Sequence, residues 1–388
     1  MRLKDIATVK GGKRLPKTDK LVSYKTDHPY IRIRDMYQSY PLEINSDFEY
    51  ITDATHEKIK RYIVNQGDVI IAVVGNTIGL VSLIGSSLDG ANLTENCNKL
   101  VEIHDCDNRF LYYFLTSKEG QDEIKKGIVG SSQPKLPIYN IEKIEIPAVP
   151  YEQQIKIVEI LETIDKKISN NETINRNLSE QTKALFEEEL LKFDSVPDGW
   201  KEGSLIDIAD YLNGLAMQKF RPSGDENELP VLKIKELRQG YCDANSELCS
   251  PNVKQEYIIH DGDVIFSWSG SLLVDFWCGG ECGLNQHLFK VTSKKYDKWF
   301  YYAWTLYHLD RFIAVAATTI GHIKREELSK AEILIPDSDS YKRIGEVLGP
   351  LYDMIISNRV ENRKLAALRD ELLPKLMSGE IDVSEVEL

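Results

Sequence analysis

Two long stretches of this chain place apolar or small polar residues at alternating spacings of three and four. The first seam consists of Leu161, Ile164, Ile168, Asn171, Asn175, Leu178, Thr182 and Leu185. The second consists of Leu348, Leu351, Ile355, Asn358, Asn362, Leu365, Arg369 and Leu372. This spacing is that of a coiled-coil seam, and Asn inside a seam fixes register at some cost in stability. Because both seams carry Asn at the same two positions, we expect the two helices to pack on each other.

The first of these helices is predicted over about 151–193, which contains neither Gly nor Pro. In the second, Gly349-Pro350 falls inside the seam. Proline removes a backbone donor and clashes with the preceding turn. We therefore expect that helix to kink or to begin a second segment there.

The rest of the chain is a duplication whose parts keep their order. The segments 3–12, 29–36, 62–76 and 160–178 align with 205–214, 230–237, 257–271 and 347–365. Short strands are predicted at 30–33, 69–74, 231–234 and 264–268, and helices near 110–115 and 300–306. The predicted class is α+β: two similar mixed α/β domains separated by two long, antiparallel coiled-coil helices. The predicted boundaries are 1–150 and 194–340 for the domains, 151–193 for the first helix, and 341–388 for the second helix and tail.

Charge is distributed unevenly between these parts. The whole chain carries a formal net charge of −13. Residues 1–150 are nonetheless neutral, with 20 basic and 20 acidic side chains, whereas 194–340 sum to −8. Ten of the basic residues lie within the first 35 positions. This basic segment suits contact with phosphates, although a solvated loop would give the same pattern.

Motifs for chemistry are missing from the sequence. There is no P-loop, no Gly-rich strand-to-helix turn for S-adenosylmethionine and no Asn-Pro-Pro-aromatic motif. Glu123-Ile124-Lys125 resembles the end of some nuclease motifs but falls in a charged helical stretch. Cys278, Cys282 and His287 lack a fourth ligand for zinc. We therefore expect no catalytic residue and no metal site, and we expect the six cysteines to be reduced in a cytoplasm.

The whole chain resembles the specificity subunit of type I restriction–modification systems. The most specific motifs are Gly67-Asp68-Val69-Ile70, its counterpart Gly262-Asp263-Val264-Ile265, and Glu152-Gln153-Gln154-Ile155 at the start of the first helix. The linker 196–200 and the tail 372–381 are equally typical. At the second helix start, Tyr341-Lys342-Arg343-Ile344 replaces the Glu-Gln pair, so identical contacts at the two starts are not implied.

The resemblance implies a definite role. Each domain would be a target-recognition domain that reads one half of a bipartite sequence in double-stranded DNA, and the helices would set the distance between the halves. Two modification subunits would dock on the helices, carry S-adenosylmethionine and methylate adenine, and restriction subunits could join them. The chain itself would carry no cofactor, would not associate with a membrane and would not be an enzyme. The alternative is a coiled-coil scaffold that binds proteins and has no DNA specificity.

Candidate DNA-binding residues follow from basic and short polar side chains at matching positions of the two copies. In the first copy they are Lys13, Arg14, Lys17, Arg32, Arg34, Asn76, Thr77, Ser131, Ser132, Gln133 and Lys135. In the second they are Gln218, Lys219, Arg221, Lys233, Lys235, Ser269, Ser271, Thr318, Thr319, His322 and Lys324, with Asn285, Gln286 and His287 as further candidates. Arg32 and Arg34 are expected on one face of a strand, where ion pairs with Asp35 or its neighbours are the alternative. Each polar loop residue could equally serve a turn or a cap.

Overall fold

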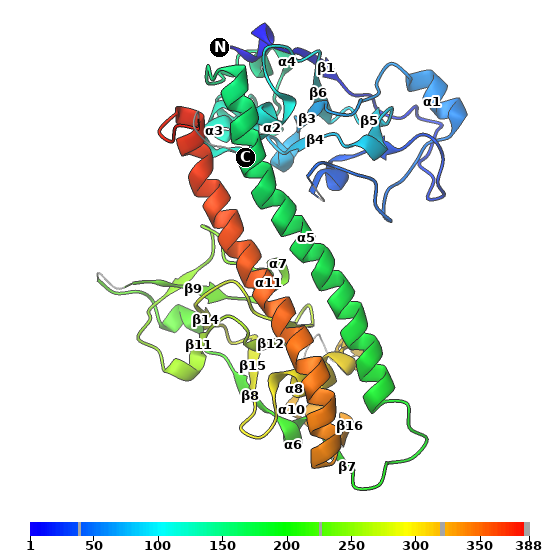
Figure 1. Ribbon diagram of the computed structural model, residues 1–388, viewed down its shortest axis with the longest axis vertical. Helices are drawn as coiled ribbons and strands as arrows, with labels where there is room; N and C mark the ends of the chain where they lie inside the picture. The colour runs from blue at the N-terminus through cyan, green and yellow to red at the C-terminus, as the bar shows by residue number, and fades with distance from the viewer. Residues whose placement is uncertain (38–39, 225–226, 319–322, 384–388) are drawn as a thin grey trace. The chain divides into compact units, whose positions relative to one another are not determined.

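The computed structural model describes residues 1–37, 40–224, 227–318 and 323–383 (Figure 1). The chain folds into two compact units. Unit 1 contains 1–166 and 365–388, and unit 2 contains 167–364. Each unit thus combines one copy of the repeated domain with the start of its own long helix and the end of the other. The domain boundaries expected from the sequence remain a prediction.

A four-stranded antiparallel sheet forms the centre of unit 1, in the order β1-β6-β3-β4. Its strands are β1 (Thr8–Gly11), β3 (Val69–Ala72), β4 (Val81–Leu83) and β6 (Cys97–Val101). A separate parallel pair joins β2 (Tyr30–Ile31) and β5 (Asn92–Leu93). The helices are α1 (Asp53–Ile59), α2 (Asn108–Thr116), α3 (Lys118–Lys126) and α4 (Ile138–Ile141). Short 3-10 turns η1 to η4 span Leu3–Asp5, Ile33–Tyr37, Gly75–Thr77 and Ser86–Leu88.

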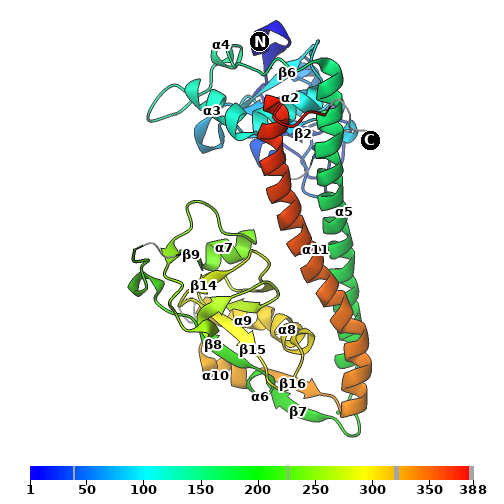
Figure 2. The ribbon, with the colours of Figure 1, turned by 60° about the vertical axis from the view of Figure 1, so that its left-hand side comes forward.

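Unit 2 repeats the order of the central sheet and the parallel pair, and it adds further short strands (Figure 2). Its sheet has the order β8-β15-β12-β13, built from β8 (Asp210–Asn213), β12 (Val264–Ser267), β13 (Leu273–Phe276) and β15 (Leu288–Thr292). The parallel pair joins β9 (Leu229–Leu232) and β14 (Cys282–Leu284), extended by β10 (Leu248–Cys249) and β11 (Ile258–Ile259). A further pair joins β7 (Lys201–Ser204) and β16 (Glu332–Ile335). The helices are α6 (Leu205–Ile208), α7 (Ile234–Gln239), α8 (Lys298–Tyr307), α9 (Leu309–Thr318) and α10 (Arg325–Ser329), with 3-10 turns η5 (Met217–Lys219) and η6 (Gln255–Tyr257).

The duplication and the α+β class predicted from the sequence are therefore confirmed, and so are the helices near 110–115 and 300–306. Two predicted strands extend too far toward the C-terminus. The strand expected at 30–33 ends at Ile31, and the one at 231–234 ends at Leu232, because a helical turn begins directly after each. Those beginning at Val69 and Val264 are shorter by one or two residues.

The repeated Gly-Asp-Val-Ile motif is a turn that leads into a central strand. Gly67 and Gly262 have φ of 85° and 84°, the left-handed region that favours glycine. The following carboxylates close the turn, because Asp68 accepts from the backbone N–H of residue 65 at 2.8 Å and Asp263 from that of residue 260 at 2.9 Å. The motif that carries the resemblance is thus a structural turn in each copy.

The two long helices α5 (Tyr151–Leu190) and α11 (Ser338–Ser378) run antiparallel within each unit (Figure 1). In unit 2, Asn171 Nδ2 donates to Asn362 Oδ1 at 2.8 Å, and Asn358 Nδ2 donates to Asn175 Oδ1 at 2.9 Å. The second amide of each copy also donates to a backbone carbonyl, Asn175 to that of residue 355 and Asn362 to that of residue 168, both at 3.3 Å. Equivalent residues therefore exchange equivalent bonds, as an isologous contact requires. The predicted packing of the Asn positions is confirmed.

In unit 1 the end of α11 packs against the domain that begins the chain. Leu373, Leu376 and Val383 belong to the same buried cluster as Leu3. Arg369 Nη1 donates to an oxygen of Asp165 in α5 at 2.8 Å. The tail therefore completes the core of the first domain.

Of the two outcomes expected at Gly349-Pro350, a new segment is wrong, since α11 is one unbroken helix from Ser338 to Ser378, and a kink stays a prediction. The glycines have a packing role. A Cβ at Gly345 would lie 3.0 Å from the indole nitrogen of Trp299, and one at Gly349 would lie 3.7 Å from its ring. Tertiary packing against this buried tryptophan (3% exposed) outweighs the local preference of the sequence.

Within the described residues, none of the helices is both long enough and apolar enough to span a membrane.

Candidate nucleic-acid interface

Three of the predicted DNA-binding residues of the first copy line one hollow of about 390 Å³. Arg14, Arg32 and Arg34 surround it together with Tyr30 and the loop 94–96. The hydroxyl of Tyr30 donates to the backbone oxygen of residue 13 at 2.8 Å, which ties the basic N-terminal loop to β2. Side chains separated by almost twenty positions are thus brought to one place.

Arg32 and Arg34 do not project from a strand, and that expectation is wrong. Asp35 accepts from the backbone N–H of Arg32 at 2.8 Å and closes the turn that starts η2. A buried carboxylate (1% exposed) that can bond the backbone stops the strand locally. Arg34 therefore lies in a 3-10 turn and Arg32 directly before it, and neither side chain projects from a sheet face.

Carboxylates hold all three arginines of this hollow. Glu49 Oε2 accepts from both Arg32 and Arg34, the latter at 2.7 Å, and Asp35 accepts from the Nε of Arg32 at 3.2 Å. Arg14 bonds Glu95 at 2.5 Å. The ion-pair alternative stated for Arg32 and Arg34 is confirmed, with Glu49 as an additional partner.

The pairing of Arg14 with Glu95 also affects protonation. Partial burial pushes the pKa of Glu95 upward, but hydrogen bonds from Arg14 and Thr94 outweigh it and hold that pKa below its usual value. The bond to Glu95 in turn raises the pKa of Arg14. Both groups are therefore charged at neutral pH, and the pair presents no net charge.

The remaining basic candidates of the N-terminal loop are exposed. The ammonium of Lys13 lies 5.6 Å from the ring centre of Tyr62, within reach of a cation–π contact. Lys17 is exposed on the same loop. These two lysines are free to approach a phosphate with little desolvation.

The two polar loops predicted for the first copy lie against each other. The N–H of Gly75 donates to the carbonyl of Pro134 at 3.2 Å, and Val74 forms a β-bridge with Lys135. The hydroxyl of Thr77 donates to the carbonyl of Val74 at 3.0 Å, which is a turn role. The exposed candidates on these loops are Asn76, Ser131, Ser132, Gln133 and Lys135.

The second copy holds its basic residues in the same manner. Lys233 is the residue before α7, and its ammonium lies 2.5 Å from Glu247, whose other oxygen is 3.0 Å from Arg221. Lys235 lies 3.0 Å from Asp243. The bond from Lys233 lowers the pKa of Glu247. Lys233 and Lys235 are, like their counterparts, at a helix start and not on a strand, so that part of the prediction is wrong here too.

The other candidates of the second copy differ in accessibility. Gln218 and Lys219 are exposed in η5, and Ser271 and Lys324 are exposed in loops. Ser269 is buried, with its hydroxyl 3.0 Å from His287 Nδ1, and Asn285 is buried as well, accepting from the N–H of His287 at 3.2 Å. Thr318 ends α9, whereas Thr319 and His322 lie outside the described residues. Gln286 contacts the His287 ring at 3.3 Å.

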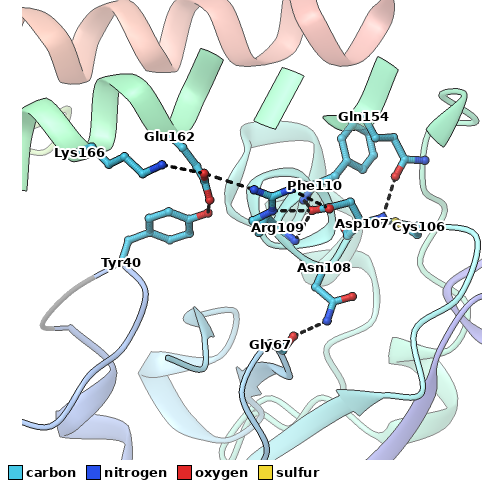
Figure 3. A network of polar contacts seen from close by, with 10 residues as sticks. All are labelled: Tyr40, Gly67, Cys106, Asp107, Asn108, Arg109, Phe110, Gln154, Glu162 and Lys166. Carbon is cyan, nitrogen blue, oxygen red and sulfur yellow. Dashed lines mark hydrogen bonds and ion pairs between the residues drawn. The ribbon is translucent and has the colours of Figure 1, made fainter. Parts of the chain in front are cut away.

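A polar network fixes α5 to the first domain (Figure 3). Gln154, fully buried, accepts from the backbone N–H of Asp107, the cap of α2, at 2.9 Å. Arg109 bonds the Asp107 carboxylate at 3.0 Å and reaches Glu162 of α5 at 3.3 Å, while the hydroxyl of Tyr40 donates to Glu162 at 3.0 Å. The bond to Asp107 raises the pKa of Arg109. The network borders a hollow of about 970 Å³.

The second copy makes the equivalent contact with another side chain. The backbone N–H of Asp297, the cap of α8, donates to the hydroxyl of Tyr341 at 2.8 Å. The same backbone group is therefore satisfied by Gln154 in one copy and by Tyr341 in the other. The different sequence at the start of the second long helix therefore supplies another acceptor, and the hydrogen bond from the capping N–H is preserved.

Burial keeps five of the six thiols in the protonated form. It raises the pKa of Cys97 and Cys106 to about 12 and that of Cys249 and Cys278 to about 11, whereas a hydrogen bond with Cys282 lowers the pKa of Cys242. No group of three or more His, Cys, Asp or Glu side chains there could hold a metal ion. Glu123 lies in α3, where its carboxylate pairs with Lys126 and accepts from the backbone N–H of Glu145 at 3.3 Å.

Comparison with known proteins gives a consistent result. The family described as "Type I restriction modification DNA specificity domain" matches residues 1–180 and again 197–367. The specificity subunit of the type I restriction enzyme MjaIX of Methanocaldococcus jannaschii is 24% identical over 418 residues, covering 99% of this chain and 94% of the relative. The HindI specificity subunit of Haemophilus influenzae is 18% identical over 355 residues, covering 70% and 77%.

Among solved structures, the S subunit of a type I restriction–modification system from M. genitalium is similar in fold. The TM-score is 0.57 at 16% identity, with 97% of this chain and 95% of the other covered.

Proposed function

Since the chain belongs to the type I restriction–modification DNA specificity family, we propose that each of its two domains reads one half of a bipartite DNA target. As the specificity subunit of such a system, the chain supplies sequence specificity and no catalysis. DNA and modification subunits are its partners. In the finer proposal two modification subunits bind it, carry S-adenosylmethionine and methylate adenine, and restriction subunits join the same complex.

The observation that carries the proposal is the duplication of one fold with basic side chains at equivalent positions. Arg32 and Arg34 follow the parallel strand of one copy, and Lys233 and Lys235 follow that of the other. A single binding site would not account for two such pairs of basic residues at equivalent positions, 201 residues apart. Two equivalent readers suit a target in two parts.

The helices support the proposal that the distance between half-sites is fixed by this chain. At about 1.5 Å per residue, the 40 residues of α5 make a rod of about 60 Å. The exchanged bonds of Asn171 with Asn362 and of Asn175 with Asn358 prevent the helices from sliding. A slip by one turn would leave four amide groups without these partners.

Affinity should depend on the partners. Charge repulsion between a chain of net charge −13 and DNA opposes binding. We therefore expect the chain alone to bind DNA weakly and the modification subunits to restore tight binding. A gel shift at several salt concentrations, with and without those subunits, measures both; nanomolar specific binding by the chain alone would contradict this expectation.

The experiment that tests the function maps methylated adenine in the genome of the host. We expect one bipartite motif that disappears when this chain is deleted and reappears when it is supplied again. A methylation pattern unaffected by the deletion would favour the protein-binding scaffold. Exchanging residues 1–150 for the first domain of a relative should change one half of the motif only.

A further inference from the structure

One glutamate occupies the same structural position in both copies. Pro29 forms a β-bridge with Tyr50, and Pro230 pairs with Leu248, in each case the residue after the glutamate. The backbone oxygen of Glu49 accepts from the N–H of residue 30 at 3.1 Å, and that of Glu247 accepts from residue 231 at 2.7 Å. The two glutamates are therefore equivalent, although the sequence around them shows no similarity.

Each of these glutamates pairs with two basic side chains, of which one is well exposed. Glu49 joins Arg32 and Arg34, and Glu247 joins Arg221 and Lys233. Glu49 and Glu247 are themselves half-buried, 30% and 21% exposed, whereas Arg34 and Arg221 are 59% and 61% exposed. In each cluster the carboxylate is thus more buried than the outer basic residue, which is the accessible one.

Charge decides what the first cluster can contribute to DNA binding, whereas the second, with Arg221 and Lys233 against Glu247, keeps one positive charge. Arg32 and Arg34 are matched by Asp35 and Glu49, so the first cluster has no net charge. A neutral cluster releases few counterions and adds little to nonspecific affinity. What it provides is donors held in one geometry, which is what base-edge recognition needs.

Arg32 illustrates this geometry. Its Nε, Nη1 and Nη2 donate to Asp35 and Glu49, which occupies three of the five N–H donors of a guanidinium. A guanidinium group fixed in this way loses little conformational entropy when it bonds a base. Arginine bonds guanine through two acceptors in the major groove.

We propose that Glu49 and Glu247 are positioning residues for base recognition, each orienting the basic side chains that read one half-site. The proposal rests on the function proposed above. It assigns readout to Arg32, Arg34, Arg221 and Lys233, and it leaves phosphate contact to exposed lysines such as Lys13.

The test compares E49Q with E247Q in the complex with the modification subunits. In methylation of duplexes varied at every target position, E49Q should lower discrimination about tenfold at one or two base pairs of one half-site, an effect of the size that a lost bidentate contact produces. E247Q should do the same in the other half-site only. Each variant is the control for the other, and circular dichroism verifies that both are folded.

A purely electrostatic role of the glutamates would give a different result. Gln removes a negative charge, so both variants would then bind all sequences more tightly, with a steeper salt dependence and an unchanged motif; this outcome would overturn the proposal. R32K keeps the positive charge and loses the forked donors of the guanidinium group. It should therefore lower discrimination at the same base pairs as E49Q. If the wild-type complex methylates no bipartite motif, the proposed function fails; if it does and E49Q leaves the motif intact, only this inference fails.

Discussion

Replacing Gly12 by alanine should destabilise unit 1 by close contact with its own backbone. A Cβ at Gly12 would lie 1.9 Å from the carbonyl oxygen of Thr94, about 1.5 Å short of the 3.4 Å at which ordinary contact begins. The other nearest atoms are also backbone, so no side chain can turn away. The equivalent Gly214 has the same constraint, with a Cβ 2.2 Å from the oxygen of Asn285.

The expected magnitude follows from what must move. Separating the segments strains the bonds from Gly12 N–H to the oxygen of Cys97 at 3.0 Å and from Lys13 N–H to that of Leu93 at 2.8 Å. Overpacking costs about 1–3 kcal/mol, and each weakened hydrogen bond costs about 1 kcal/mol. The lower entropy of the unfolded alanine chain offsets about 0.4–1 kcal/mol. Gly12→Ala should therefore lower the free energy of unfolding by about 2–4 kcal/mol.

The assay uses the uneven distribution of tryptophan. All five tryptophans lie in unit 2, at positions 200, 268, 277, 299 and 304. In urea, Gly12→Ala should shift the transition seen by far-ultraviolet circular dichroism by about 1–2 M, given a slope of about 2 kcal/mol/M. Gly214→Ala should shift the fluorescence transition.

Gly11→Ala is the matched control, because a Cβ there would meet only the Asn98 side chain at 3.5 Å. It should leave both transitions within about 0.5 kcal/mol of the wild type, as is usual for substitutions without a steric conflict. Equal stability of Gly12→Ala and Gly11→Ala would refute the reasoning.

Three further predictions concern the helices and a buried histidine. In a double-mutant cycle, Asn171→Ala and Asn362→Ala should show a coupling of about 1 kcal/mol in the fluorescence transition, and additive effects would contradict the exchanged bonds. Burial lowers the pKa of His308 below 6.5, so the folded state favours the neutral imidazole. The free energy of unfolding should therefore be highest above pH 6.5 and should fall as the pH decreases. In urea titrations at several pH values, His308→Asn should flatten this dependence. Four residues inserted into each helix, after Lys166 and after Lys364, extend it by about 6 Å and rotate it by about 40°. Because a base pair advances DNA by about 3.4 Å and turns it by about 35°, methylation mapping should show a spacer longer by one or two base pairs, whereas an unchanged spacer at full activity would show that the helices do not set the distance.

Local pattern was enough to predict the long helices and the duplication. The three–four spacing of the seams reflects the helical repeat itself. Aligned segments such as 62–76 and 257–271 remain similar in sequence because turn and strand positions tolerate few residue types. The Gly-Asp-Val-Ile turn is an example, since a positive φ demands glycine whatever surrounds it.

Contacts between distant positions were decided only by the tertiary structure. The strands at 30–33 and 231–234 end early because a helical turn follows directly, capped in the first copy by the buried carboxylate of Asp35. The equivalence of Glu49 with Glu247 shows in backbone pairing and not in sequence, because what is kept is the place of a charge. The backbone N–H that caps the helix has Gln154 as its acceptor in the first copy and Tyr341 in the second. The residue type can differ because a hydrogen bond requires only an acceptor at that point in space. Periodicity and turn chemistry are local and can be read along the chain, whereas the partner of a charge or of a buried donor depends on which segments the fold brings together.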